Sequence, residues 1–215
     1  MSTIEDLPAE ILFDIFARLP VKSAFLLRWV CKSFKTLITS SDFIHFHLER
    51  NPMKNSSDYL LIRSTEIECM SRICARTFAR DLDIKLPENA VYELGSELTV
   101  YGSYNGLLCI SNRYLCVDSP IYLWNPSIRK IRRLPYGLIT STINDHDYQV
   151  TLGMGFHSAG GNDYKVIKFV HHDTDSENTF QVEVYSLNSN SWKRISRVPI
   201  PLFHEMLIFA PNVHI

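Results

Sequence analysis

The sequence lacks several features that would assign it to a broad class at once. No apolar run approaches the roughly 18 residues of a membrane-spanning helix, and the N-terminus MSTIEDLPAE carries acids where a secretory signal carries bases. The 22 Lys and Arg are balanced by 23 Asp and Glu, so no basic excess favours nucleic acid or a lipid surface. The five cysteines form no C-x-x-C pair, so neither a zinc ribbon nor a disulfide framework follows. These absences predict a cytoplasmic or nuclear protein that binds neither membrane nor nucleic acid.

Signatures of catalysis and of cofactors are also missing. Gly153-Met154-Gly155 lacks the third glycine of a dinucleotide-binding loop, because position 158 is serine. His171, His172 and the acids that follow them read as a polar loop without a distant third ligand, so a solvated turn is favoured over a metal site. We expect a non-catalytic protein with no cofactor and no metal.

The residues that are present divide the chain near residue 50. Before that point, Ile11, Leu12, Ile15, Phe16 and Leu19 form one stripe with helical spacing. Pro8 suits the first turn of a helix and Pro20 stops its continuation, so the pattern predicts a helix over 8–18. The apolar residues up to position 50 repeat this spacing, and we expect three short helices over 1–50.

Beyond about Tyr59 the pattern changes to short β-rich runs, such as YLLI, GLLCI, YKVIKFV and VEVYSL, separated by Gly, Pro, Asn and Ser. Residues 63–94 carry scattered charges and are the least readable part. We therefore predict a loop-rich connection with the first strand or strands over 51–94, and a mostly β domain over 95–215. The fold class is α+β multidomain.

The β region contains a weak internal sequence repeat. Asn125 and Asn188 are each followed five residues later by a lysine and then by an apolar-proline pair. Each copy reads as strand, polar turn, strand and proline exit, which favours a hairpin repeated in successive sheets of a propeller. An unrelated meander or sandwich remains the alternative.

The run LPAEILFDIFARLPVKSAFLLRWVCKSFKTLITSSDFIHFH, residues 7–47, resembles the F-box. The matches are ordered along the whole run: Leu7-Pro8 with Glu10, Leu19-Pro20, Arg28, Val30-Cys31-Lys32, an aromatic at Phe34, and Leu37-Ile38 before Ser41. The family usually has Trp where this chain has Phe34, a departure that keeps an aromatic side chain.

The β region resembles the plant F-box-associated domain of the kelch-like type 1. The runs YGSYNGLLCISN, IYLWNPSIRKIRRLP, LGMGFHSAGGNDYKVIKFV and VEVYSLNSNSWKRI match its successive motifs in order and spacing. Within that family, the overall texture is similar to the S-locus F-box proteins of pollen. This resemblance implies self-incompatibility as the setting and S-locus ribonucleases as targets.

The resemblance implies an adaptor of a Skp–cullin–F-box ubiquitin ligase. The F-box would dock on the Skp adaptor, which leads to the cullin and RING subunits, while the β domain would bind the protein to be ubiquitinated. By the family's motif, the residues in contact with Skp or supporting that contact are Leu7, Pro8, Ile11, Leu12, Ile15, Leu19, Pro20, Val30, Cys31 and Lys32. The alternative for the stripe from Ile11 to Leu19 is that it packs the F-box's own small core.

Four bases stand within five residues of the β region: Arg129, Lys130, Arg132 and Arg133. Such a cluster is a candidate contact for a target protein, and the alternative is a charged flank of an exposed hairpin.

The length of the β region bears on whether its propeller can close, because a closed propeller needs at least roughly 160 to 180 residues. We therefore expect a partial, truncated associated domain, and a chain that binds Skp without a competent target site is the rival to the adaptor.

Overall fold

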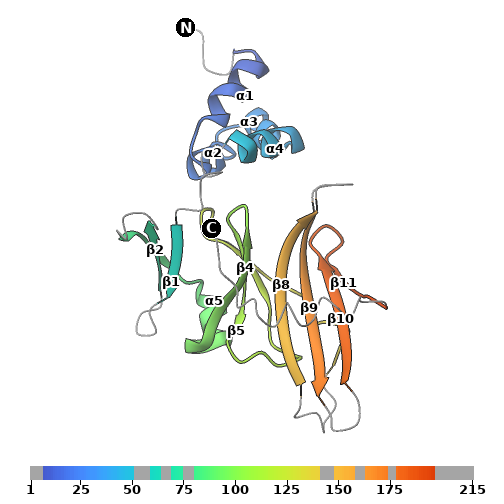
Figure 1. Cartoon of the computed structure of the whole chain (residues 1–215). Helices are drawn as coiled ribbons and strands as arrows, with labels where there is room; N and C mark the ends of the chain where they lie inside the picture. Colours follow the sequence, from blue (N-terminus) through green and yellow to red (C-terminus); the bar gives the residue numbers. More distant parts are fainter. Residues whose placement is uncertain are drawn as a thin grey trace. The chain divides into compact units, whose positions relative to one another are not determined.

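The computed structural model describes residues 7–50, 59–63, 69–74, 80–140, 148–157, 163–173 and 178–196 (Figure 1). The chain forms two compact units, Met1–Ser57 and Asp58–Ile215, and we call them the helical unit and the β unit. The sequence pattern placed this division near residue 50. Among the described residues, no helix combines the length and the apolar character that crossing a bilayer requires.

Residues 7–50 of the helical unit form four helices, α1 (Ala9–Ala17), α2 (Val21–Leu27), α3 (Lys32–Thr39) and α4 (Ser41–Arg50), where the sequence predicted three. Pro8 and Pro20 stand at the N-caps of α1 and α2, as their lack of an N–H favours. The Cys31 sulfur caps α3 by accepting from the Phe34 N–H at 3.5 Å. The extra helix, α4, follows Ser40, whose hydroxyl oxygen accepts from the Phe43 N–H at 3.2 Å.

Aromatic side chains fill the core of the helical unit. Phe16 and Phe34 meet edge to face with their ring centres 4.8 Å apart, and Phe13 meets Phe43 at 5.3 Å. Phe34 therefore places its aromatic ring inside this core. The buried His47 links two parts of the helical unit, because its Nε2–H donates to the Leu19 carbonyl oxygen at 2.9 Å and ties α4 to the residues that follow α1.

In the β unit, the described residues form three antiparallel meanders in chain order. The first joins β1 (Tyr59–Arg63), β2 (Cys69–Cys74) and β3 (Arg80–Lys85). Helix α5 (Glu88–Leu94) and a 3-10 turn (Gly95–Glu97) follow. The second meander joins β4 (Leu98–Tyr104), β5 (Leu107–Asn112), β6 (Tyr122–Asn125) and β7 (Lys130–Arg133). The third joins β8 (Tyr148–His157), β9 (Asp163–Asp173), β10 (Asn178–Ser186) and β11 (Ser191–Arg194).

The structure corrects the expectation of a loop-rich stretch over 63–94. This part of the chain contains β2, β3 and α5. Strand β3, RDLDIK, alternates apolar Leu82 and Ile84 with charged residues, and the charges hid the two-residue period of a strand with one exposed face. Residues 64–68 and 75–79 lie outside the described residues.

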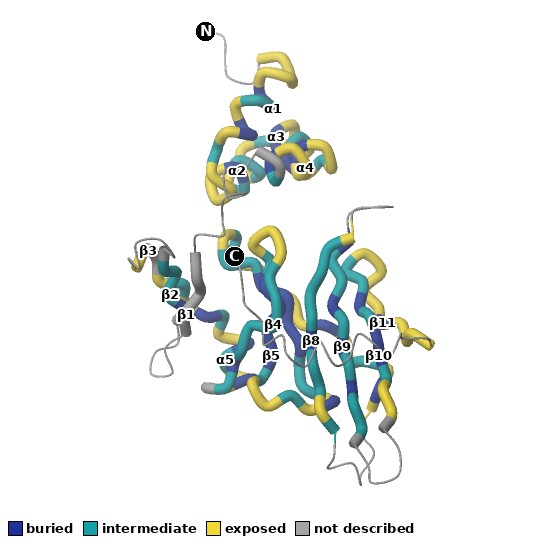
Figure 2. The backbone as a smooth tube through the Cα atoms, viewed as in Figure 1, coloured by how far each residue is buried: buried dark blue, intermediate teal, exposed yellow. Residues whose placement is uncertain are grey.

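The second meander packs on both faces. One face joins Leu108, Ile110 and Trp124 to Leu94 of α5 and Met70 of β2 in one core. The other face joins Cys109 and Leu123 to Val166, Tyr185 and Trp192 of the third meander. Figure 2 shows buried stretches along β5, β9 and β10. Successive meanders stacked face to face are the arrangement of propeller blades, so the fold is propeller-like, as the sequence predicted.

The first strands of two successive blades come close at Gly102. A Cβ atom at this position would lie 2.9 Å from the Met154 Cβ of β8, which is too close for any side chain. Gly102 also follows a register shift in the pairing of β4 with β5. Only glycine therefore allows β4 and β8 to approach each other at this point.

The internal sequence repeat is a repeated hairpin, but the alignment of its two copies differs from the predicted one. Leu134 N–H donates to the Ile121 carbonyl oxygen after β7, and Ile195 N–H makes the same bond to Val182 after β11. The left-handed residues that close the two turns are Arg129 (φ 52°) and Asn190 (φ 51°). Asn125 therefore corresponds to Ser186, the last residue of β10, and not to Asn188.

His171 and His172 lie within β9 and not in a polar loop, which corrects the interpretation of the sequence. Both are half-buried, and the His171 ring stacks on Phe180 with ring centres 4.5 Å apart. Within the described residues, no group of three or more His, Cys, Asp and Glu side chains is arranged to hold a metal ion.

Candidate docking surfaces

The helical unit leaves a set of large apolar side chains at its surface. Ile11 and Ile15 on α1 are exposed, as is Leu7 before it, and Ile11 retains 49% of its accessible surface. Pro8, Pro20, Val30 and Lys32 are exposed as well. Seven of the ten residues predicted for the Skp contact therefore lie at the surface of this unit.

The other three predicted residues contribute to the core of the helical unit. Leu12 is buried beside Phe16, and Leu19 and Cys31 are half-buried against the same core. The stripe on α1 thus divides: Leu12 and Phe16 point inward, while Ile11 and Ile15 point outward. The two readings of the stripe apply to different residues within it.

The sequence reasoning missed the exposed apolar residues near the end of α2. Trp29 is 81% exposed and Leu26 is 63% exposed; Trp29 directly precedes Val30, and Leu26 stands four residues before it. The i, i+3, i+4 spacing of Leu26, Trp29 and Val30 was a usable signal, because it predicts one side of a helical turn.

Positive charge accompanies this apolar surface. The segment from Ile15 to Ser41 contains the bases Arg18, Lys22, Arg28, Lys32 and Lys35, and no acidic residue. Arg18 is paired with Asp14 at 2.6 Å on α1. A partner with an apolar and acidic surface would therefore complement this part of the helical unit.

The structure divides the four bases predicted as a target contact. Successive side chains of β7 alternate between the faces of its sheet. Arg133 lies on the face toward α5, where its Nε donates to Glu93 Oε2 at 3.0 Å. Lys130 and Arg132 lie on the opposite face from Ile131 and Arg133, and Arg129 sits in the turn. The four bases therefore do not form one continuous patch.

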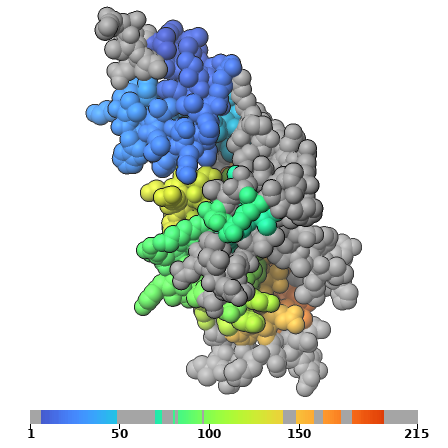
Figure 3. All heavy atoms as spheres, turned by 90° about the vertical axis from the view of Figure 1, so that its left-hand side faces the viewer, coloured from blue at the N-terminus to red at the C-terminus, as the bar shows by residue number. Residues whose placement is uncertain are grey.

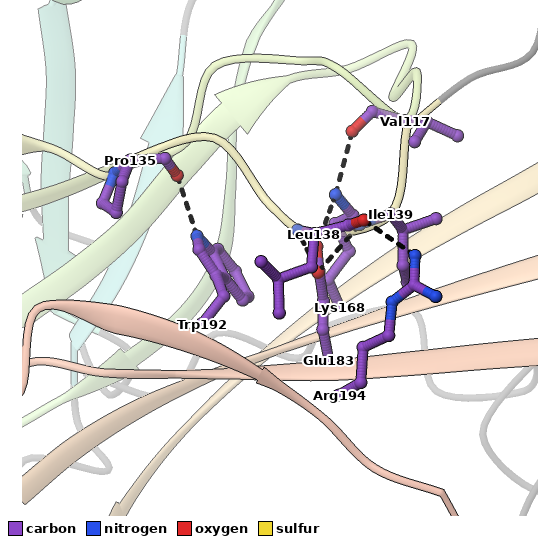
Figure 4. Close-up of polar contacts among 8 residues, drawn as sticks. All are labelled: Val117, Pro135, Leu138, Ile139, Lys168, Glu183, Trp192 and Arg194. Carbon is purple, nitrogen blue, oxygen red and sulfur yellow. Dashed lines mark hydrogen bonds and ion pairs between the residues drawn. The ribbon is translucent and has the colours of Figure 1, made fainter.

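A buried ion pair lies within the third blade (Figure 4). Lys168 on β9 and Glu183 on β10 are directly opposite in register, and their Nζ and Oε1 atoms lie 2.7 Å apart. Glu183 is fully buried and Lys168 nearly so. The Lys168 Nζ also donates to the Val117 carbonyl oxygen at 2.9 Å.

The same cluster holds the segment that follows β7. The N–H groups of Leu138 and Ile139 donate to Glu183 Oε2 at 2.6 and 3.2 Å. Trp192 Nε1 donates to the Pro135 carbonyl oxygen at 2.8 Å, and Arg194 donates to that of Leu138 at 2.7 Å. Every charged group of this cluster has a partner inside the protein, so we assign it a structural role.

The fold and these surfaces define a class of protein. A small helical unit with exposed apolar side chains and a propeller-like unit built of successive blades are both typical of protein-binding modules. The structure thus defines a protein of two parts, a small helical unit and a propeller-like β unit.

Comparison with known families identifies the class more closely. The model of the F-box domain matches residues 4–46, and the model of the F-box associated beta propeller domain matches residues 67–208. The chain belongs to the family of F-box proteins with an F-box associated β-propeller domain. No solved structure matches the chain significantly.

Similar proteins come from Arabidopsis thaliana. F-box protein CPR1 is 35% identical over 92% of this chain and 46% of its own length. F-box protein At3g07870 is 28% identical over 91% of this chain and 50% of its own, and F-box/kelch-repeat protein At3g23880 is 28% identical over 93% and 54%. The chain therefore spans about half the length of these relatives. Their names do not mention the S-locus, and that assignment stays a prediction.

Proposed function

We propose that this protein is the substrate-recognition adaptor of a Skp–cullin–F-box ubiquitin ligase. The helical unit docks on the Skp adaptor, and the β unit binds the target protein. The adaptor performs no chemistry itself. It raises the effective concentration of target lysines near the conjugating enzyme that the RING subunit recruits through the cullin. Such a complex works in the cytoplasm or nucleus.

The observation that carries this proposal is the division of apolar residues on α1. Leu12 and Phe16 fill the core of the helical unit, so Ile11 and Ile15 have no role inside it. Burying a large apolar side chain at an interface contributes roughly 1.5 to 3 kcal/mol before the costs of association. Leu7, Ile11, Ile15 and Val30 are the exposed apolar side chains that a Skp adaptor would cover.

The test is co-expression of the full chain with a Skp adaptor, followed by size-exclusion chromatography. The variant Leu7→Ala/Pro8→Ala/Ile15→Asp should remain folded, because all three side chains are exposed, and should lose the complex. Ile44→Asp on α4 is the matched control, because Ile44 is 48% exposed and lies outside the predicted contact. A folded wild-type chain that fails to bind Skp would refute the adaptor function.

The target is the finer part of the proposal. Resemblance of the β region to the S-locus F-box proteins supports S-locus ribonucleases as the first candidates to test. The rival is a chain that binds Skp but has no competent target site. Ubiquitination of a candidate ribonuclease by the reconstituted ligase separates the two, because the rival predicts Skp binding without target modification.

A further inference from the structure

An open pocket of about 560 Å³ lies on the β unit between α5 and the second blade. The outer side of α5 contributes Glu88, Tyr92 and Glu93, and the strands β6 and β7 contribute Tyr122, Ile131 and Arg133. Figure 3 shows residues of the β unit near α5, coloured green, at the surface of the face in view. The volume suits one long side chain and its flanking peptide.

Two side chains that line the pocket, Arg133 and Glu93, already interact within the protein. Arg133 donates to Glu93 at 3.0 Å and to the Tyr136 hydroxyl at 2.9 Å, and its guanidinium lies 4.7 Å from the Tyr136 ring centre. A hydrogen bond from Tyr122, reinforced by Arg133 against the effect of burial, lowers the pKa of Glu93. Glu93 is therefore ionised at neutral pH and fixes the wall of the pocket.

The charge of the pocket is negative once this pair is counted. Glu93 and Arg133 cancel, and Glu88 adds a second carboxylate. Glu88 meets Lys85 at 3.3 Å, but the two side chains are 85% and 75% exposed, so this pair is weak and exchanges readily with another cation. A positively charged ligand is therefore favoured over an anion.

Tyr92 gives the pocket an exposed aromatic wall. It is 91% exposed, although Ala90 and Leu94 of the same short helix are buried in the core. A tyrosine lies four residues after Glu88, which places the ring and the carboxylate on the same side of α5. An aromatic face beside a carboxylate binds a planar guanidinium by stacking and by paired hydrogen bonds.

We propose that this pocket binds an arginine side chain presented by the target protein. The arginine's methylene groups lie on Ile131, its guanidinium stacks on Tyr92, and its N–H groups donate to Glu88. Arginine is favoured over lysine because its planar guanidinium can stack flat on the ring while it donates paired hydrogen bonds to the carboxylate. This inference rests on the proposed function of the β unit as the target-binding part.

The probe is the capped tripeptide acetyl-Gly-Arg-Gly-amide, titrated into the full chain in complex with Skp. The Ile131 methyl signal is followed by NMR and assigned with Ile131→Leu. We expect a saturable shift with the arginine peptide and binding at least about tenfold weaker for the uncharged citrulline peptide, which loses both the charge and the cation–π contact. Glu88→Gln/Tyr92→Ala should remove the shift.

Tyr114→Ala is the matched control, because Tyr114, like Tyr92, is an exposed tyrosine. Tyr114 lies beside Arg113 and outside the pocket. The substitution should leave the titration unchanged. Equal binding of citrulline, an unchanged shift in the double variant, or no shift at the highest soluble peptide concentration would each overturn the proposal. Skp binding is scored separately on the same samples: its failure refutes the adaptor function, and the titration on the free chain still reports on the pocket.

Discussion

At the scale of single residues, Gly137 shows how closely the segment after the second blade packs against the third blade. A Cβ atom there would overlap Glu183 Oε1 and would come 2.7 Å from Lys168 Nζ, so the absence of a side chain makes room for the ion pair. The buried pair tolerates little displacement, because each charge depends on its partner and on a backbone group. The glycine is required for space and not for a special backbone angle.

Replacing Gly137 therefore tests the fit. We expect Gly137→Ala to lower the free energy of unfolding by about 2 to 4 kcal/mol, since the methyl group must separate the buried charges or displace the segment. Urea unfolding followed by the fluorescence of the buried Trp124 and Trp192 measures this change. Gly155→Ala is the control, because no atom lies within 4 Å of its Cβ position, and it should change stability by less than about 0.5 kcal/mol. Equal effects of the two substitutions would contradict the steric argument.

The buried pair could not be predicted from the sequence. Lys168 and Glu183 become neighbours only through the register of β9 with β10, and a sequence does not state which residues of two strands are opposite. The inward charge also breaks the expectation that lysine and glutamate of a strand face water. By contrast, the division of the bases on β7 followed from the two-residue period and was available before the structure.

At the scale of elements, the start of β9 and the turn between β10 and β11 are held together by Asp163. Its carboxylate accepts from Ser186 Oγ at 2.5 Å and from the Asn188 N–H at 3.0 Å, and it pairs with Lys165 at 2.5 Å. Burial opposes ionisation of Asp163, but the bonds from Lys165, Ser186 and Asn188 outweigh it, and its pKa is lowered. The ionised form therefore stabilises this corner of the third blade.

A lowered pKa fixes the direction of the pH dependence. The stabilisation by Asp163 is fully present above its pKa in the unfolded chain, about 3.9, and is lost as the pH falls through the lower pKa of the folded state. We expect Asp163→Asn to cost about 1 to 2 kcal/mol at pH 7 and progressively less as the pH is lowered below about 4. Urea unfolding at several pH values measures the difference.

Asp83→Asn is the control for this effect. The Asp83 carboxylate bonds Arg80 and Ser71, which lower its pKa, but both members of its ion pair are about half exposed. Solvent screens such a pair, so its replacement should have a much smaller effect at any pH. If Asp163→Asn were as mild as Asp83→Asn, or if its cost did not change toward low pH, the proposed role of the carboxylate would be wrong.

The elements themselves were predicted unevenly. The helix over 8–18 and the runs in the second and third blades carried clear periods, and proline marked the helix starts. The repeated hairpin was recognised from the sequence, but the two copies were aligned by matching Asn125 with Asn188, which gave the wrong register. The structure aligns the copies by the left-handed residue before the returning strand, Arg129 in one turn and Asn190 in the other. An arginine gives no sequence signal for that conformation, whereas an asparagine does.

At the scale of the whole molecule, the two units are expected to differ in stability. The helical unit comprises only Met1–Ser57, and domains of this size bury a small fraction of their surface and are marginally stable alone. It also leaves Ile11, Ile15, Leu26, Trp29 and Val30 exposed. The β unit encloses cores on both faces of its second blade. A partner that covers the exposed apolar residues should therefore stabilise the helical unit in particular.

Hydrogen exchange of the backbone amides tests this difference. In the chain alone, we expect the amides of α1 and α3 to exchange faster than those of β5 and β9, because the smaller core opens more easily. Saturating Skp should slow exchange in α1 and α3 at least about tenfold, while β5 and β9 remain unchanged, since binding stabilises only the unit that it contacts. The Leu7→Ala/Pro8→Ala/Ile15→Asp variant should show no slowing. Protection that rose equally in both units would mean that the helical unit does not bind Skp as a separate module.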